Sequence, residues 1–180
     1  MKTQTMNDTQ LRYGNFQLSV LVILRMMIGW HFLYEGVIKA LNPSWSAGGF
    51  LMDSKWIFAD FFHSLATNPT TLDIVNTLNV WGLIAIGLGL ITGLFSRAAA
   101  VGGMVLLAMY YLSHPPLIGL KYALPAEGSY LIVNKNLIEI FALAVLFAFP
   151  TSRIVGLDRL IFKAPVDEED IVVEKEMQNV

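Results

Sequence analysis

Four ionisable side chains lie within or beside the first long apolar segment of the sequence. His31, Glu35 and Lys39 follow one another at intervals of four residues, and Arg25 precedes them. Residues four apart share one face of an α-helix, so the last three form a polar stripe. A charged side chain at membrane depth costs at least about 2.5 kcal/mol, and it usually marks a functional site. His31 is the strongest candidate for proton exchange, because imidazole gains and loses a proton near neutral pH.

A fifth ionisable group lies in the last apolar segment. Glu139 follows Asn136 by three residues, so both lie on one side of a helix. At ~1.5 Å rise per residue, Glu139 lies about 12 Å inside the outer boundary and about level with His31. We therefore expect Arg25 or His31 to pair with Glu139. An Arg25–Glu139 pair that only fixes the register of two helices is an equally good interpretation.

Other polar side chains are expected near the outer boundary. Glu35 should pair with Lys39 or Lys135, and both lysines should extend toward the lipid headgroups. His63 and His114 are expected to make interfacial polar contacts. The three histidines lie on different segments without metal-ligand spacing, so the sequence predicts no metal site.

Aromatic residues gather toward the same outer side, and most are typical of an interface belt. They also suit a flat pocket between the first and last apolar segments, of the kind that accepts a quinone. The candidates for proton exchange are His31, Glu35 and Glu139, and those for quinone binding are Arg25, Phe32, Tyr34 and Asn136. In this hypothesis, Arg25 keeps the Glu139 carboxylate ionised.

Composition narrows the class of protein. Of 180 residues, 55% are hydrophobic and 14% are charged, whereas soluble domains have about a quarter charged. The net charge of −2 gives no sign of a nucleic-acid partner. The chain has no cysteine, which excludes disulfides, Fe–S clusters and thiol relays within it. A redox role therefore needs a bound organic cofactor or a partner subunit.

The apolar segments predict an all-α integral membrane four-helix bundle. A spanning helix needs about 20 apolar residues, and four segments qualify. They cover residues 18–40, 78–95, 97–114 and 131–149. Only Ser96 and Arg97 separate the apolar parts of the second and third segments, which requires a tight hairpin.

The first outer connection contains an amphipathic pattern. Phe58, Phe61, Phe62 and Leu65 recur at helical spacing. The stretch is too short to span a bilayer, so it predicts a short interfacial helix.

Glycines predict where helices approach closely. Gly29 and Gly36 share a face with Arg25 and Phe32, and small residues let a neighbouring helix pack tightly. We expect the last span to be that neighbour. The Gly89-x-x-x-Gly93 motif is also read as a helix-packing motif rather than a nucleotide site.

The ends of the chain differ in character from its middle. Residues 1–17 form a polar leader that fits a signal peptide poorly, residues 18–163 form the membrane domain, and residues 164–180 form an acidic, solvated tail. Six basic residues lie on the side of the termini and four on the other, which places both termini in the cytoplasm. The six are Lys2, Arg12, Arg97, Arg153, Arg159 and Lys163; the four are Lys39, Lys55, Lys121 and Lys135.

Three blocks of the sequence resemble the DoxX family, the DoxD/DoxX group of small four-helix membrane proteins. "RMMIGWHFLYEGVIKALNP" resembles the family's arginine followed by Gly-x-x-Phe-x-x-x-Gly-x-x-Lys, and "GLITGLFSRAAA" its Gly…Arg-Ala turn. "VNKNLIEIFALAVLF" resembles its asparagine-rich start of the last helix, and the resemblance extends from Leu18 to Asp158. The matching positions are Arg25, Gly29, Phe32, Gly36, Lys39, Arg97 and Asn136.

The resemblance implies a four-helix bundle in the cytoplasmic membrane of a prokaryote. DoxD is a subunit of an archaeal thiosulfate:quinone oxidoreductase, so the resemblance also implies a quinone-linked membrane subunit. In that interpretation Glu139 and His31 exchange protons with a quinol, and the partners are the lipid bilayer and a redox subunit or a second copy of the chain. Two alternatives remain: a non-enzymatic scaffold that binds a partner protein, and a small-molecule transporter that uses the same charges.

Overall fold

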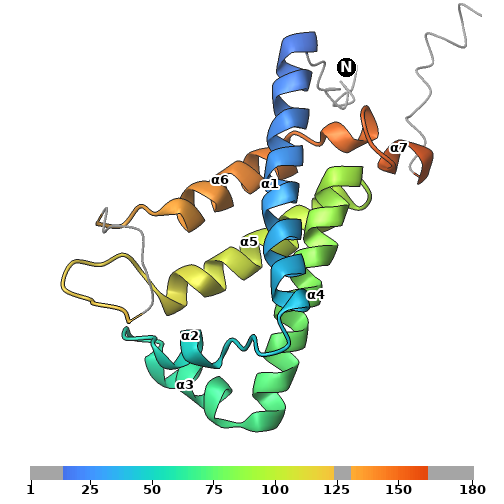
Figure 1. Ribbon diagram of the computed structural model, residues 1–180. Helices are drawn as coiled ribbons and strands as arrows, with labels where there is room; N and C mark the ends of the chain where they lie inside the picture. The colour runs from blue at the N-terminus through green and yellow to red at the C-terminus, as the bar shows by residue number, and fades with distance from the viewer. Residues whose placement is uncertain (1–13, 124–130, 162–180) are drawn as a thin grey trace, which may run out of the picture.

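The computed structural model describes residues 14–123 and 131–161. All regular structure in these residues is helical, and they contain no strand. The four long helices are α1 (Asn15–Leu41), α4 (Pro69–Thr92), α5 (Ser96–Ser113) and α6 (Lys135–Ala148) (Figure 1). Shorter elements lie in the connections: α2 (Gly48–Met52), α3 (Ala59–Thr67), the 3-10 turn η1 (Thr151–Arg153) and α7 (Asp158–Ile161).

The four long helices overlap the four apolar segments, and the second helix extends well beyond its apolar segment at its start. Helix α4 begins at Pro69, not near residue 78. The Asn68 side chain accepts hydrogen bonds from the backbone N–H groups of Thr70 and Thr71, and proline is favoured at the first helical position. The first turns of α4 are polar, so hydrophobicity alone does not reveal them. Helix α6 begins at Lys135, four residues after the start of its apolar segment. The Asn134 side chain caps it by accepting a hydrogen bond from the Leu137 N–H group.

The hairpin between α4 and α5 turns at residues 93–95. Gly93 ends α4 with a left-handed backbone (φ +68°), a conformation that glycine adopts without steric cost. Phe95 is also left-handed, with φ +48°. Ser96 and Arg97, predicted to be the connection, are the first residues of α5. Gly93 therefore terminates a helix rather than packing against one along its length.

Glycines let α1 and α4 approach closely. This confirms that Gly29 and Gly36 lie on a helix-contact face, but the helix that packs on this face is not the predicted one. A Cβ on Gly29 would lie 2.9 Å from Ile91 Cγ1, and one on Gly36 would lie 2.7 Å from Ile84 Cγ1. From α4, a Cβ on Gly87 would lie only 2.5 Å from the backbone nitrogen of Leu33. The neighbour of this face is α4, not the last span. Both helices therefore contribute glycines to the contact, Gly29 and Gly36 from α1 and Gly87 from α4.

Helix α6 packs mainly on α5 and closes the core from the other side. Leu143 is completely buried, and a Cβ on Gly103 of α5 would lie 2.9 Å from its Cδ1 atom. Phe32 of α1 reaches the same place, 3.2 Å from that Cβ position. The core therefore contains side chains from all four long helices.

The first connection forms a small layer of its own at the far end of α4. The predicted amphipathic helix is α3, and α2, which was not predicted, packs beside it (Figure 1). Phe62 is 2% exposed and packs with Ala47 and Leu51. Phe62 of the predicted pattern thus contacts protein, whereas Phe58 and Phe61 are exposed.

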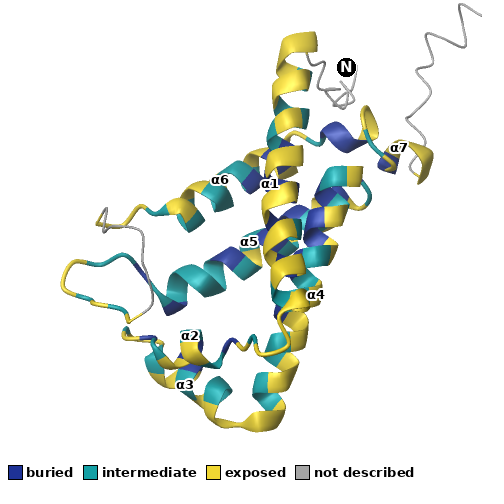
Figure 2. Ribbon diagram, in the orientation of Figure 1, coloured by how far each residue is buried: buried dark blue, intermediate teal, exposed yellow. Residues whose placement is uncertain are grey.

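The outer surfaces of the long helices are strongly apolar. Met27, Trp30 and Trp81 are more than 60% exposed, and Figure 2 shows exposed residues along most of the visible face of α1. Among the described residues, α1 and α4 are long and apolar enough to cross a membrane. The predicted tail at 164–180 and most of the leader at 1–17 lie outside the described residues.

Candidate functional site

The polar stripe of α1 meets a carboxylate of α6. His31 Nδ1 lies 3.8 Å from Glu139 Oε1, and Lys39 Nζ lies 3.5 Å from Glu35 Oε2. The Glu139 side chain is 13% exposed and that of His31 is 47% exposed. Of the pairings left open by the sequence, the structure therefore contains His31–Glu139 and Glu35–Lys39. The two candidates for proton exchange on α1 and α6 thus lie near each other.

Lys39 does not extend into the lipid headgroups as predicted. Its side chain is only 16% exposed, and its ammonium lies 5.3 Å from the Trp45 ring and 5.7 Å from the Tyr110 ring. Asn79 Oδ1 lies 3.5 Å from the same ammonium, and Asn79 donates a 2.6 Å hydrogen bond to the Tyr110 hydroxyl. Attraction between the cation and two ring faces stabilises this inward position.

Arg25 does not contact Glu139, so its predicted role of keeping that carboxylate ionised is not supported by the geometry. Its guanidinium donates hydrogen bonds to Thr151 Oγ1 at 3.0 Å and to the Val155 carbonyl at 2.7 Å. Arg25 is 4% exposed. It holds the segment after α6 against the middle of α1.

Asp158 completes this arrangement, which we call the Arg25 cluster (Arg25, Thr151, Val155 and Asp158). The Asp158 carboxylate accepts hydrogen bonds from the backbone N–H groups of Phe95, at 2.7 Å, and Ser96, at 3.3 Å. Burial alone would raise the pKa of Asp158, but hydrogen bonds from Ser152, Phe95 and Ser96 outweigh it and hold the pKa below its ordinary value. The carboxylate thus caps α5 and supports the left-handed Phe95.

The other predicted site residues are dispersed. Phe32 is 2% exposed and lies in the helical core, so it is not available to line a pocket. Tyr34 is exposed and stacks against Trp30, with ring centroids 6.4 Å apart. Asn136 is half-buried in the first turn of α6, three residues before Glu139. Tyr34 and Asn136 therefore flank the His31–Glu139 pair along their own helices.

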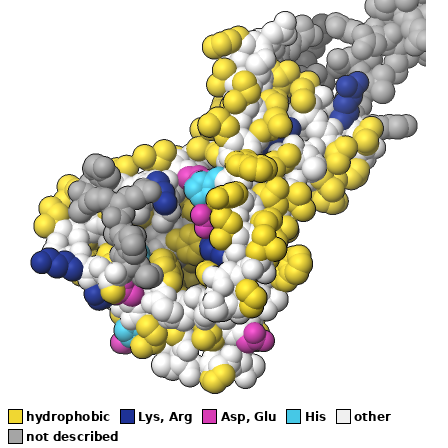
Figure 3. Space-filling model, in the orientation of Figure 1, with side chains coloured by type: hydrophobic (Ala, Val, Ile, Leu, Met, Phe, Trp, Pro, Cys, Tyr) yellow, Lys and Arg dark blue, Asp and Glu magenta, His cyan; other side chains and the backbone are white. Residues whose placement is uncertain are grey.

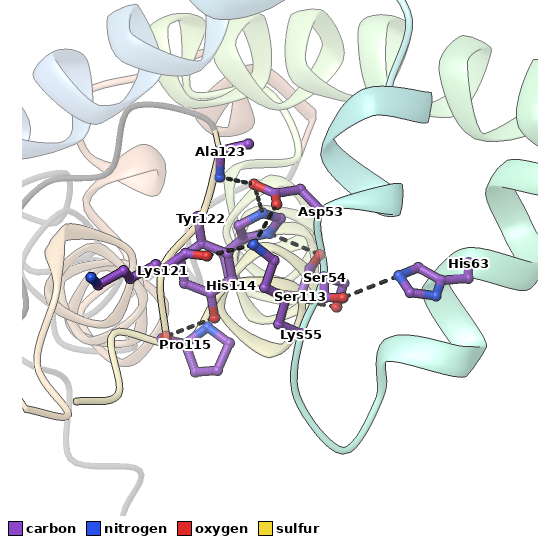
Figure 4. A network of polar contacts seen from close by, with 10 residues as sticks. All are labelled: Asp53, Ser54, Lys55, His63, Ser113, His114, Pro115, Lys121, Tyr122 and Ala123. Atoms are coloured by element: carbon purple, nitrogen blue, oxygen red, sulfur yellow. Dashed lines mark hydrogen bonds and ion pairs between the residues drawn. The ribbon is translucent and has the colours of Figure 1, made fainter. Parts of the chain in front are cut away.

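A second polar network ties the two outer connections together (Figure 4). Asp53 accepts a 2.7 Å hydrogen bond from the Ala123 N–H group, lies 3.2 Å from Lys55 Nζ and lies 3.7 Å from His114 Nε2. The His114 ring stacks between Phe50 and Tyr122, with centroids 4.0 and 4.4 Å away. Burial lowers the pKa of His114, although Asp53 opposes the shift. This arrangement stabilises the neutral imidazole and fixes the connection after α5.

His63 makes the expected polar contact within the first connection, where its Nε2 atom lies 3.1 Å from the Ser54 carbonyl. In the part of the chain that the structure describes, no group of three or more His, Asp or Glu side chains gathers as a metal site would require.

Sequence reasoning missed three residues that lie beside Lys39 and Arg25, namely Asn79, Thr151 and Asp158. Asn79 is an amide inside an apolar span, a signal that was present but was not used. Thr151 and Asp158 lie after the last span and have no local pattern that relates them to Arg25. Their role depends on the chain returning to the α4–α5 turn, where Leu157 N–H bonds to the Thr92 carbonyl at 3.0 Å.

Comparison with known proteins places these elements in one family. The family profile DoxX matches residues 20–115, more than half of the 180-residue chain. The matched range contains the polar stripe, the α1–α4 contact and the α4–α5 turn. No curated protein and no solved structure matches the chain. The protein is an all-helical membrane protein, and it belongs to the DoxX family.

Proposed function

We propose that α1, α4, α5 and α6 cross the cytoplasmic membrane of a prokaryote as a four-helix bundle with both termini in the cytoplasm. The exposed apolar side chains on these helices support this placement. Helix α5 is about 27 Å long and α6 about 21 Å, so α6 is short for a hydrocarbon layer of about 30 Å. The exposed residues Leu131, Ile132 and Val133 precede α6 and extend its apolar length.

In this orientation α2 and α3 lie at the outer boundary. Six basic residues on the side of the termini and four on the other side support it, because cytoplasmic loops are enriched in Lys and Arg. Residues 18–163 form one membrane domain in this proposal, with a leader and an acidic tail on the cytoplasmic side.

Within the bundle, the protein acts as a membrane subunit of a quinone-linked oxidoreductase. The His31–Glu139 pair carries this proposal, because it joins an imidazole and a carboxyl group across two helices at membrane depth. Reduction of a quinone takes up two electrons and two protons. His31 and Glu139 supply the protons, and Glu35, one turn from His31, passes protons to them. The electrons come from a partner subunit that carries a redox cofactor, because this chain has no cysteine.

The quinone ring binds on the face of the bundle where α1 and α6 present these side chains. Tyr34 and Asn136 flank the pair and contact the ring. Arg25 and Phe32 have no part in this pocket, because one is bonded to Thr151 and Val155 and the other is in the core.

Quinone binding and proton uptake test the proposal. The full-length protein in phosphatidylcholine nanodiscs should bind decylubiquinone. Its reduction by reduced methyl viologen, a one-electron donor whose own oxidation releases no proton, should draw protons from a weakly buffered indicator solution. Glu139→Gln and His31→Gln should slow this uptake at least about tenfold, since general acid–base groups contribute about 10²–10⁴-fold. His63→Gln is the matched control and should leave the rate unchanged.

Two results would reject the quinone role. In the first, neither extracted quinone nor added decylubiquinone is found with the protein. In the second, both variants take up protons at the wild-type rate. A stable protein partner that is retained by the His31 variant, together with no quinone, would instead indicate the scaffold function.

A further inference from the structure

Lys39 has the features of a ligand-binding cation rather than of a structural one. A lysine ammonium has three hydrogen-bond donors. Its two oxygen contacts, to Glu35 Oε2 and Asn79 Oδ1, are both 3.5 Å long. Charge-assisted N–H···O bonds normally measure about 2.7–2.9 Å. Within the described residues, Lys39 therefore has no short acceptor, and its donors remain available to an incoming oxygen.

Tyr110 offers a second donor beside it. The Tyr110 hydroxyl accepts a 2.6 Å hydrogen bond from Asn79 Nδ2, which leaves its own hydrogen free to donate. Within the described residues no acceptor for that hydrogen is found. Asn79 is only 8% exposed, so it fixes both neighbouring groups without reaching a ligand itself.

The surroundings match a flat ligand. The Trp45 and Tyr110 rings lie on two sides of the ammonium, and Phe50 packs edge-to-face on Tyr110 at 5.7 Å. Figure 3 shows a hollow beside α1 with hydrophobic side chains at its floor and basic, acidic and histidine side chains at its border. Lys39 and His31 are eight residues apart, about 12 Å along the axis of α1. A single ring with a hydrogen bond at each end fits between two groups at this separation.

We infer that Lys39 and Tyr110 bind one carbonyl oxygen of a quinone headgroup, with its ring against Trp45 and its other oxygen toward the His31–Glu139 pair. This inference rests on the proposed function and adds the residues that orient the ring. Asn79 is a positioning residue, because it holds Lys39 and Tyr110 and does not contact the ligand. The phosphate of an anionic lipid is the competing ligand, because its oxygen atoms could accept the same two hydrogen bonds.

Decylubiquinone binding tests the inference, measured as quenching of tryptophan fluorescence in phosphatidylcholine nanodiscs. Lys39→Met should raise the Kd about tenfold, and Tyr110→Phe about threefold, as the loss of one hydrogen bond predicts. Lys121→Met is the matched control, because Lys121 is an exposed lysine whose side chain points away from the outer network (Figure 4). It should bind like the wild type.

The outcomes separate this inference from the proposed function. If the wild type binds no quinone, the proposed function fails and the inference fails with it. If quinone binds and both Lys39→Met and Tyr110→Phe leave the Kd unchanged, only the inference is overturned. A Lys39→Met protein that keeps its quinone affinity but loses copurifying phosphatidylglycerol would also overturn it, in favour of a lipid site. If Lys39→Met does not fold, the Tyr110→Phe result decides.

Discussion

The contact between α1 and α4 has a basic side chain of α1 at each end, Arg25 beside Gly93 and Lys39 beside Asn79, and the hydrogen bonds of the two differ strongly. Arg25 makes hydrogen bonds of 3.0 and 2.7 Å, whereas both oxygen contacts of Lys39 are 3.5 Å long. Arg25 is 4% exposed, and the Lys39 side chain is 16% exposed. A buried cation with short bonds holds elements together, while one with long contacts retains the capacity to bind.

Backbone packing explains the contrast. At the Arg25 end, a Cβ on Gly93 would lie 2.8 Å from Gly156 Cα, so two backbones meet beside the guanidinium. The Thr151 hydroxyl and the Val155 carbonyl are therefore brought within hydrogen-bond distance of it. At the Lys39 end, the neighbours of the ammonium are side chains, and in the described part of the chain its oxygen contacts are those to Asn79 and Glu35.

Breaking the contact between α1 and α4 should have the largest effect, because both ends depend on it. Gly87→Val should prevent folding, since even a Cβ there would lie 2.5 Å from Leu33 N and 2.7 Å from the Gly29 carbonyl. Yield of monodisperse protein after detergent extraction measures this. Gly82→Ala in the same helix is the control, because no atom lies within 4 Å of a Cβ there. A well-folded Gly87→Val protein would contradict the packing described.

Removing each cation in turn tests the comparison directly. Arg25→Met should lower the free energy of unfolding by about 3 kcal/mol, as expected when a buried polar network loses one partner. Lys39→Met should lower it by less than about 1 kcal/mol, because long contacts contribute little. Thermal unfolding in nanodiscs measures both, with the exposed Arg153→Met as control. Equal losses for Arg25→Met and Lys39→Met would remove the distinction between the two ends.

Acid should selectively weaken the Arg25 end. The folded pKa of Asp158 lies below its ordinary value, so its contribution is complete above about pH 4 and is lost as pH falls through the folded pKa. Asp158→Asn should lower the stability at pH 7 by about 1–2 kcal/mol. The difference between wild type and variant should shrink below pH 4. Melting temperatures across pH 3–7 measure it, and a constant difference would show that the carboxylate charge is irrelevant.

Replacing His114, which lies nearer to Lys39 than to Arg25 in the fold, should have the smallest effect. Its folded pKa is lowered by burial, so the stability due to the neutral ring is complete above about pH 6.5 and is lost as pH falls through the folded pKa. The Asp53 carboxylate opposes this lowering of the pKa and so limits the effect, whereas the Lys55 ammonium adds to the lowering. His114→Phe should make the melting temperature less dependent on pH between 7.5 and 5. His63→Phe should not, and equal slopes for both would argue against a buried neutral His114.

The approximate number and position of the long helices could be predicted, because apolar length is a local property. The same is true of the buried face of α1, since Arg25, Gly29, Phe32 and Gly36 share a helical face and all are buried. Apolar length did not reveal where α4 starts, because the first turns of α4 are polar. Asn68 caps this helix, which starts at Pro69. The neighbour of the glycine face was also missed, since helical periodicity shows which side is buried but not which helix covers it.

The sequence by itself determined that this is an all-helical membrane protein with His31, Glu35 and Lys39 along one stripe, because hydrophobic length and a four-residue spacing do not depend on tertiary contacts. Only the tertiary structure decided how the charges are used. Whether Arg25 met Glu139 or Thr151 depended on how the chain after α6 returns to the α4–α5 turn. Whether Lys39 faced lipid headgroups or protein depended on Trp45, Asn79 and Tyr110, which come from three distant segments. Pairing between distant residues is set by packing, and packing is not local.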